Sequence, residues 1–334
     1  MTYAAFKSIG AYIPKDIMTN ADFEKIIDTS DEWIVKRTGI KERRVALKDE
    51  VPSDMGAKAS LQAIQRAGIN KDDIDLIICA TVTPDFLCMP STACVIAGKL
   101  DIPNVMAFDV SAACTGFVYA LSIAKAFIES NLKKNVLIIG SEKYSSILNY
   151  QDRTTCFLFG DGAGAAIISA TQNKEEAIID VNCSSDGAYE DLIKTTGGGS
   201  KYPCSTEVVE KRLAYITMKG NETFKLAVKT LTSDVVKMLA KHNLNNSDIT
   251  HFIPHQANYR IIKAVGEALG LNEEQTIVTV HKYGNTSAAS IPMAMNDAFE
   301  EGRIKAGDMV LFDAFGSGLT WGSALFRFAP TKIS

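Results

Sequence analysis

Hydrophobic and polar positions follow two patterns, one typical of strands and one typical of helices, and the two patterns alternate along the whole chain. Short apolar runs bounded by polar residues predict strands, and longer stretches with apolar residues every three to four positions predict amphipathic helices. The predicted strands are residues 76–80, 105–110, 136–139, 165–169, 252–254 and 309–312. The predicted helices are residues 55–67, 115–130, 222–242, 259–269 and 288–301. Strands alternating with helices in this way are typical of an α/β protein.

The same pattern occurs twice, in the same order. The matching segments are residues 73–80 with 248–255, 135–139 with 308–312, and 159–162 with 315–318. Chance similarity rarely keeps its order, so the matches indicate a duplicated fold. We expect an N-terminal half at residues 1–172 and a C-terminal half at residues 173–334, with an insertion near residues 183–215.

Composition narrows the class of protein. The chain has 334 residues, 46% of them hydrophobic, which is enough for a large core in two domains or one double domain. The net charge is −4, with both signs scattered along the chain. Binding to nucleic acid or to a membrane surface needs clustered positive charge, so we expect neither. No apolar run approaches the roughly 18 residues of a membrane span, and the first 14 residues do not have the layout of a signal peptide.

The cysteines and histidines bear on two further features, disulfide bonds and metal sites. Seven cysteines without a CxxC pair indicate reduced thiols in a cytoplasmic protein rather than a disulfide framework. None of the four histidines lies at short spacing from a cysteine. A metal site is therefore not expected.

Cys114 is the first candidate for chemistry. It follows the predicted strand 105–110 and stands in a tight turn of small residues that opens the helix 115–130. A helix N-terminus supplies partial positive charge and unpaired N–H groups, which favour a reactive thiolate and can hold the oxyanion of an attacked thioester. An isolated cysteine here is more often a small buried packing residue. The small neighbours at residues 111–113 and at Gly116 favour a substrate site instead.

His255 and Asn285 are the other two candidates. His255 ends the strand 252–254 before a helix, where a histidine can be merely structural. Asn285 lies in the segment 283–290 (YGNTSAAS), where an ordinary helix N-cap would explain it equally well. Cys114 and Asn285 fall at comparable places in the two halves, each before a long helix. A duplicated fold can therefore bring the three side chains to one junction.

Residues 109–114 (DVSAAC), 254–258 (PHQAN) and 284–290 (GNTSAAS) resemble β-ketoacyl-acyl-carrier-protein synthase III. The likeness extends from residues 29–34 (TSDEWI) to 319–324 (LTWGSA), nearly end to end. It implies a thiolase-type duplicated fold of the α/β class, layered αβαβα with two pseudo-symmetric halves, in a homodimer without a cofactor. It also implies an acyltransferase that starts fatty-acid synthesis by condensing a short acyl-CoA primer with malonyl-ACP.

The implied chemistry fits the candidate residues. Cys114 would attack the acyl-CoA and store the acyl group as a thioester. The malonyl thioester then loses carbon dioxide, and neutral His255 and the Asn285 amide would donate hydrogen bonds to the enolate that forms. The backbone N–H groups of Cys114 and Ser317 would form the oxyanion hole. Relatives more often carry glycine at the position of Ser317.

The resemblance also implies binding residues. The CoA-binding residues would be Trp33, Arg37, Arg153, Gly220, Phe224 and Asn258. Docking of the acidic acyl carrier protein would use Lys225, Arg260 and Lys263, with Glu267 weakening this patch. Met89 would reach across the dimer interface into the partner's primer pocket, or would merely fill a gap in that interface.

Three alternatives stay open. A related synthase or acyltransferase of the same fold could serve secondary metabolism or use another acceptor. A non-catalytic CoA-binding scaffold is the alternative outside enzymes, and the intact set of Cys114, His255 and Asn285 argues against it. A Cys–His–Asn hydrolase is chemically conceivable, although a duplicated α/β architecture does not suit it.

Overall fold

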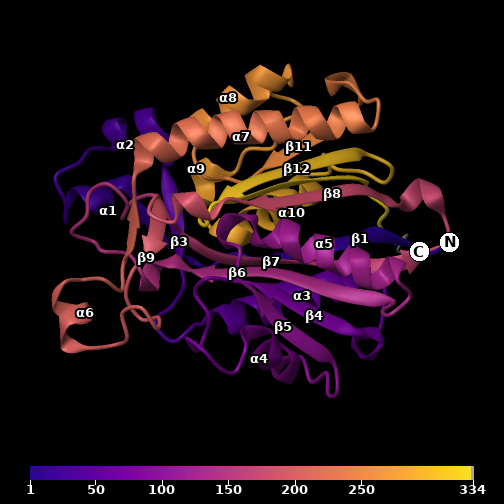
Figure 1. Cartoon of the computed structure of the whole chain (residues 1–334), viewed down its shortest axis with the longest axis horizontal. Helices are drawn as coiled ribbons and strands as arrows, with labels where there is room; N and C mark the ends of the chain where they lie inside the picture. Colours follow the sequence, from indigo (N-terminus) through magenta and orange to yellow (C-terminus); the bar gives the residue numbers. More distant parts are fainter. Residues whose placement is uncertain (332–334) are drawn as a thin grey trace.

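Two mixed β-sheets form the centre of the molecule in the computed structural model, which describes residues 1–331 (Figure 1). The first sheet has five strands in the order β1-β7-β6-β4-β5. Strand β4 is parallel to β5 and β6, whereas β7 is antiparallel to β6 and β1. The bounds are β1 Tyr3–Tyr12, β4 Leu76–Ala80, β5 Met106–Val110, β6 Asn135–Lys143 and β7 Asp161–Thr171.

The second sheet repeats this order. Its strands lie in the order β8-β13-β12-β11, and a parallel bridge between Phe252 and Thr276 continues it beyond β11. Strand β11 is parallel to β12, and β13 is antiparallel to both of its neighbours. The bounds are β8 Ile178–Ser185, β11 His251–Pro254, β12 Met309–Gly316 and β13 Thr320–Arg327. The segments matched in the sequence thus occupy equivalent places, β4 with β11, β6 with β12 and β7 with β13.

Six helices complete the layers. Helices α5 and α10 lie between the sheets, α3 and α4 cover the outer face of the first sheet, and α7 and α8 cover the outer face of the second (Figure 1). Their bounds are α3 Pro52–Ala67, α4 Thr92–Lys99, α5 Gly116–Glu129, α7 Gly220–Lys241, α8 Tyr259–Leu269 and α10 Ser290–Glu300. This is the layered αβαβα arrangement that the sequence predicted. Among residues 1–331, no helix has both the length and the apolar character needed to cross a bilayer.

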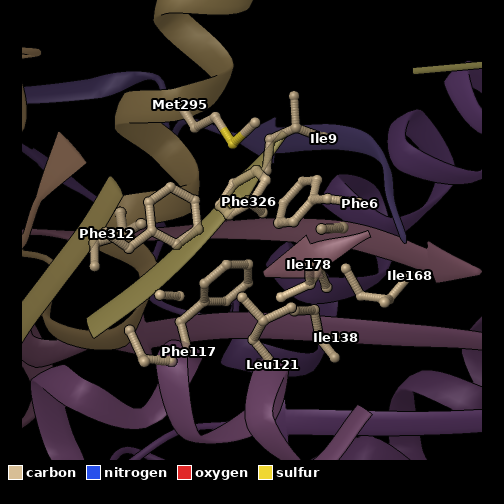
Figure 2. Packing of buried hydrophobic residues seen from close by; sticks show 14 of the residues in the cluster. Phe6, Ile9, Phe117, Leu121, Ile138, Ile168, Ile178, Met295, Phe312 and Phe326 are labelled. Carbon is tan, nitrogen blue, oxygen red and sulfur yellow. The ribbon is translucent and has the colours of Figure 1, made fainter. Parts of the chain in front are cut away.

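The core between the sheets explains why α5 is apolar nearly all round. Phe117 and Leu121 of α5 pack with residues of both sheets in one buried cluster (Figure 2). Phe6 of β1 stacks on Phe326 of β13 with ring centroids 4.7 Å apart, so the cluster joins the two sheets directly. A helix buried on all sides has no polar face to expose.

The smaller elements form one inserted segment in each half, outside the two main sheets. One lies between β1 and α3, the other between β8 and α7, and each contains a two-stranded sheet. The sequence indicated an insertion only near residues 183–215, so the first inserted segment was missed. The bounds are β2 Asp16–Thr19, α1 Asn20–Glu24, α2 Asp31–Thr38, β3 Glu42–Val45, β9 Ile193–Thr195, α6 Thr206–Glu210 and β10 Ile216–Met218. A further short helix, α9, spans Val280–Tyr283.

Two 3₁₀ turns place the catalytic candidates. Turn η2 (Ala113–Thr115) leads into α5, and turn η7 (Ser287–Ala289) leads into α10. The turns pack against each other between the sheets. Counted from these turns, the equivalent of Cys114 is Ala288, and Asn285 lies three residues earlier than the sequence comparison suggested.

Candidate active site

A cavity of about 980 Å³ brings together the candidates from both halves of the chain. Cys114, His255 and Asn285 are buried in it, whereas Arg37 and Arg153 at its other end are exposed. The cavity is therefore a tunnel from the surface to the junction of η2 and η7. The predicted site residues that line it are Trp33, Arg37, Cys114, Arg153, Gly220, Phe224, Lys225, His255, Asn258, Arg260, Asn285 and Ser317.

Cys114 sits in a strained turn held by the start of β13. Ala113 has a φ of +47°, in the left-handed region that a residue with a Cβ seldom adopts. The hydroxyl of Thr320 donates to the carbonyl of Ala112 at 2.9 Å, and the hydroxyl of Thr115 donates to the carbonyl of Thr320 at 3.2 Å. These bonds fix the turn from both sides. Strain maintained by surrounding structure is common at functional sites.

The ionisation of Cys114 differs from the prediction. The helix N-terminus led us to expect a lowered pKa, but burial raises the pKa of the thiol to about 12. A hydrogen bond with Ser287 acts in the opposite direction without overcoming burial. Desolvation penalises the thiolate more than the short turn stabilises it. The resting nucleophile is therefore a thiol, and acylation needs an acceptor for its proton.

His255 is held as a neutral imidazole. It directly follows β11 and is buried, and burial lowers its pKa to about 3. Its Nδ1 lies 2.6 Å from the Oγ of Ser290, the first residue of α10. An imidazole that accepts the Ser290 hydroxyl at Nδ1 carries its proton on Nε2, where it can donate into the cavity.

The turn after His255 is fixed by a buried glutamine. The amide of Gln256 donates to the carbonyls of Pro254 and Ile277 and accepts the backbone N–H groups of Thr279 and Val280. The following helix begins at Tyr259, as its hydrophobic pattern predicted, and Asn258 is its N-cap. The intervening residues let His255 face the cavity instead of joining a helix.

Asn285 is oriented by the backbone. Its main chain bridges to Phe159, with Asn285 N–H donating to Leu158 and Asn285 C=O accepting from Gly160. Its Oδ1 accepts the N–H of Ser287 at 2.8 Å. Because the oxygen is engaged there, the Nδ2 group is the part of the amide left to donate to a ligand.

The end of β12 lies close against the nucleophile. A Cβ at Gly316 would lie 2.8 Å from the backbone nitrogen of Cys114, so only glycine allows this approach. Ser317 follows and lines the cavity, while its Oγ donates to the carbonyl of Ile193 at 2.5 Å. The side chain of Ser317 is thus turned to β9, which leaves its backbone N–H as the group for an oxyanion.

Aromatic and cationic side chains surround the entrance. The guanidinium carbons of Arg37 and Arg153 lie 4.5 and 5.4 Å from the centre of the Trp33 ring. Arg260 lies 5.2 Å from the ring centre of Phe224. The side chain of Asn258 donates to the carbonyl of Arg37 at 3.1 Å and so links α8 to α2. A flat ring beside several cations suits a ligand that combines an aromatic base with phosphates.

Two predicted residues lie outside this cavity. The side chain of Met89 is 79% exposed on the loop before α4. Lys263 lies on α8, and its Nζ is 3.8 Å from a carboxylate oxygen of Glu267. Their predicted roles concern partner molecules and stay predictions.

The polar groups behind the three candidates were not predicted from the sequence. Ser287 and Ser290 lie inside the motif 284–290. Their closeness in sequence to Asn285 could have indicated that they belong to the site. Glu142 and Tyr144 gave no such indication, because they lie at the end of β6 and the start of turn η3, far in sequence from the three candidates. Glu142 is fully buried, and burial raises its pKa to about 7.

Comparisons with known proteins agree with this geometry. Residues 108–187 match the family model of 3-oxoacyl-[acyl-carrier-protein (ACP)] synthase III, and residues 239–328 match the model of its C-terminal part. The chain is 78% identical to the β-ketoacyl-[acyl-carrier-protein] synthase III of Aliarcobacter butzleri, over 99% of this chain and all of the relative.

Solved structures have the same fold. The 3-oxoacyl-[acyl-carrier-protein] synthase III of Aquifex aeolicus superposes with a TM-score of 0.90 at 44% identity, covering 97% of this chain and 99% of the other. The priming β-ketosynthase of the R1128 polyketide pathway also gives 0.90, at 32% identity, covering 98% of this chain and 96% of the other.

Proposed function

The chain belongs to the 3-oxoacyl-[acyl-carrier-protein] synthase III family, and we propose that it condenses a short acyl-CoA primer with malonyl-ACP through an acyl-Cys114 intermediate. The products are 3-ketoacyl-ACP, CoA and carbon dioxide. The observation that carries this proposal is the meeting of Cys114, His255 and Asn285 at the closed end of one tunnel. Acetyl-CoA is the expected primer, and the reaction starts type II fatty-acid synthesis.

In the first half-reaction, Cys114 attacks the carbonyl carbon of the acyl-CoA. The backbone N–H groups of Cys114 and Ser317 stabilise the oxyanion of the tetrahedral intermediate, which then expels the CoA thiolate. The close approach of Gly316 to the nitrogen of Cys114 supports this pairing of donors. The acyl-Cys114 thioester is as reactive toward a nucleophile as the acyl-CoA thioester that it replaces.

In the second half-reaction, malonyl-ACP enters the same tunnel and loses carbon dioxide. The electrons of the broken C–C bond form an enolate, whose carbon attacks the Cys114 thioester. The Nε2–H of His255 and the Nδ2 of Asn285 donate to the enolate oxygen. An imidazole with a pKa near 3 remains a neutral donor, and its hydrogen bond stabilises charge that only the reaction creates.

The entrance supports the proposal for CoA. Trp33 would stack on the adenine, and Arg37 and Arg153 would contact its phosphates. Gly220, Phe224 and Asn258 would line the path of the pantetheine arm. Arg153 also pairs with Asp28 at 3.0 Å, an exposed contact that a phosphate can replace at little cost.

The carrier protein and the partner subunit belong to the proposal as well. Lys225 and Arg260 lie at the tunnel entrance, where an acidic acyl carrier protein would dock, with Lys263 one turn further along α8. We infer a homodimer in which Met89 closes the partner's primer pocket. All seven cysteines lie in the described part of the chain and are free, which supports a cytoplasmic location.

Intact-protein mass spectrometry tests the proposal. After incubation with a panel of acyl-CoAs, we expect one acyl group per chain, on the peptide that contains Cys114. The Cys114→Ala variant should stay folded and form no adduct, whereas Cys183→Ala is the matched control and should be acylated normally. An unchanged adduct in Cys114→Ala would refute the assignment.

The same assay separates the alternatives. A CoA-binding scaffold would form no adduct at all. A synthase of secondary metabolism would accept the primer but prefer a different acceptor over malonyl-ACP. The 78% identity to a β-ketoacyl-[acyl-carrier-protein] synthase III, against 32% to a priming β-ketosynthase of a polyketide pathway, supports the first of these functions over the second.

A further inference from the structure

A buried guanidinium lies close to the tunnel entrance, and the reaction as described leaves it without a role. Arg43 of β3 is only 1% exposed. Its Nη1 donates to the carbonyl of Met18 at 3.1 Å and to the Oδ1 of Asn20 at 2.9 Å, and its Nη2 donates to the carbonyl of Phe157 at 2.6 Å. Burial lowers the pKa of Arg43 to about 10, so the group is still charged at neutral pH. Burying a charge is costly, and these bonds offset that cost.

The three acceptors of Arg43 lie in segments that are far apart in the sequence. Met18 belongs to β2 and Asn20 begins α1, both in the inserted segment between β1 and α3. Phe157 belongs to the segment 150–159, between β6 and β7. The planar guanidinium fixes the directions in which its N–H groups point. Arg43 therefore holds the inserted segment and the segment 150–159 at a fixed distance from each other.

The two segments that Arg43 joins carry the side chains around the tunnel entrance. Trp33 and Arg37 lie on α2 in the inserted segment, and Arg153 lies in the segment 150–159. We call these three residues the CoA clamp. The guanidinium carbons of Arg37 and Arg153 lie 4.5 and 5.4 Å from the centre of the Trp33 ring. The geometry of the clamp therefore depends on how the two segments are held together.

Asn20 extends the link from Arg43 to α2. Its side chain is buried, and its Nδ2 donates to the Oδ1 of Asp31 at 2.7 Å and to the carbonyl of Ile40 at 2.8 Å. Asp31 is the first residue of α2, and Ile40 lies just after its end. The amide thus binds both ends of the helix that carries two residues of the clamp, while its oxygen accepts from Arg43.

Phe157 makes the link on the other side. Its carbonyl accepts from Arg43, and its ring meets the Trp33 ring edge-on, with centroids 5.4 Å apart and planes at 84°. Phe23 of α1 and Ile34 of α2 belong to the same buried cluster as Phe157. The guanidinium carbon of Arg43 lies 4.6 Å from the centre of the Phe23 ring. A displacement of Phe157 would therefore reach Trp33 directly.

We propose that Arg43 is a positioning residue for CoA, which holds α2 and the segment 150–159 at the spacing at which the CoA clamp binds the adenine and the phosphates. The inference rests on the proposed function, because it concerns the CoA end of the same tunnel. Arg43 does not line the cavity, so it acts through the residues of the clamp.

Two acetyl thioesters of different length test this role. Acetyl-CoA reaches the clamp, whereas acetyl-pantetheine lacks the adenine and its phosphates. Arg43→Met keeps an unbranched apolar stem and removes the donors. It should raise the KM of Cys114 acylation for acetyl-CoA by about 10-fold or more, as expected when cation–π contacts and charge-assisted hydrogen bonds are weakened. Its kcat/KM for acetyl-pantetheine should stay within about twofold of wild type, because that primer does not use the clamp.

Two further variants separate positioning from damage to the fold. Asn20→Ala leaves Arg43 in place and removes only the link to α2. It should show the same contrast between the two thioesters, and it decides the question if Arg43→Met does not fold. Arg44→Met is the matched control, because Arg44 is the next residue of β3 and pairs with Glu42 of the same strand at 3.0 Å instead. It should keep the wild-type constants for both thioesters.

Calorimetry with CoA itself adds a readout that does not need turnover. Arg43→Met and Asn20→Ala should bind CoA about 10-fold more weakly than wild type, again through the weakened contacts of the clamp. Equal losses with both thioesters in the folded variants, or an unchanged KM for acetyl-CoA, would overturn the role of Arg43. If the wild-type protein binds CoA yet forms no adduct from either thioester, the proposed function fails, and the CoA affinities of the variants still decide the role of Arg43.

Discussion

His255 and Asn285 are held by hydrogen bonds to different residues, and neither bond involves the nucleophile. Each residue can therefore be tested separately from Cys114. His255 is held through Nδ1 by Ser290, while Asn285 is held through Oδ1 by the N–H of Ser287. In both residues a nitrogen is left to donate into the cavity. Neither contact involves Cys114, so removing these donors should leave the thiol in place.

The first prediction is that these two residues matter more for condensation than for acylation. His255→Ala should slow condensation with malonyl-ACP by about 10²–10³-fold, the cost of losing one oxyanion donor, while the Cys114 adduct still forms. Asn285→Asp should do the same, since it keeps the Oδ1 acceptor for Ser287 and replaces the donor with a carboxyl oxygen. The measurement pairs carbon dioxide release with intact-protein mass. Variants that condense at the wild-type rate, or that fail to form the Cys114 adduct, would show the roles to be wrong.

The second prediction concerns stability and again involves Glu142. Its pKa is about 4.5 when unfolded and about 7 in the fold, so its contribution to stability is fully present below pH 4.5 and is lost as pH rises through 7. The raised pKa corresponds to ~3 kcal/mol at most. Glu142→Gln cannot ionise, so its free energy of unfolding relative to wild type should increase from pH 5 to pH 8. Urea unfolding of both proteins at the two pH values measures this. If the free energies of unfolding of variant and wild type differ by the same amount at both pH values, Glu142 does not titrate in the folded protein.

At the scale of elements, the site depends on how closely turn η7 approaches the first sheet. A Cβ at Gly140 of β6 would lie 2.3 Å from the carbonyl oxygen of Ala288 in η7. Gly140 stands two residues before Glu142 on the same strand. This close approach lets η7 pack directly against β6.

The third prediction follows from this contact. Gly140→Ala should push η7 away, lowering the free energy of unfolding by about 1–3 kcal/mol and slowing condensation. Gly98→Ala in α4 is the control, because its added Cβ meets no atom within 4 Å. It should be neutral or stabilise the helix by about 0.5–1 kcal/mol. Chemical denaturation and turnover of both variants provide the test, and two equally harmless substitutions would contradict the role given to Gly140.

The elements also show why the sequence predicted some parts and missed others. Strand β4 and helix α8 have the bounds that their hydrophobic patterns predicted, because each buries a regular face or run. Strand β1 was not predicted, since a register shift between Phe6 and Ser8 interrupts its alternation. Glu142 was missed for another reason: it is bound by Thr81 and Thr83, which are far away in sequence. We propose that the two halves meet between residues 172 and 173, in the connection from β7 to β8.

At the scale of the whole molecule, the loop before α4 and the edge strand β5 present exposed apolar side chains. Phe86, Leu87 and Met89 are exposed by 52%, 65% and 79% on the loop before α4. Strand β5 forms an open edge of the first sheet, and its Met106 is 44% exposed. Open strand edges and apolar patches are normally covered, which supports a homodimer through this face.

The last prediction concerns the residue that such a dimer would send into its partner. Met89 does not line the cavity of its own chain, so any effect on primer choice must act across the interface. Methionine is unbranched and adaptable, and it can cap acetyl yet move aside for butyryl. Met89→Phe should therefore lower kcat/KM for butyryl-CoA far more than for acetyl-CoA, with each methylene worth about 1–3 kcal/mol. Leu132→Phe, at an exposed position after α5, is the control and should leave the ratio of the two constants unchanged. If Met89→Phe also leaves that ratio unchanged in a correctly assembled dimer, Met89 only fills the interface, and the limit on primer length lies within a single chain.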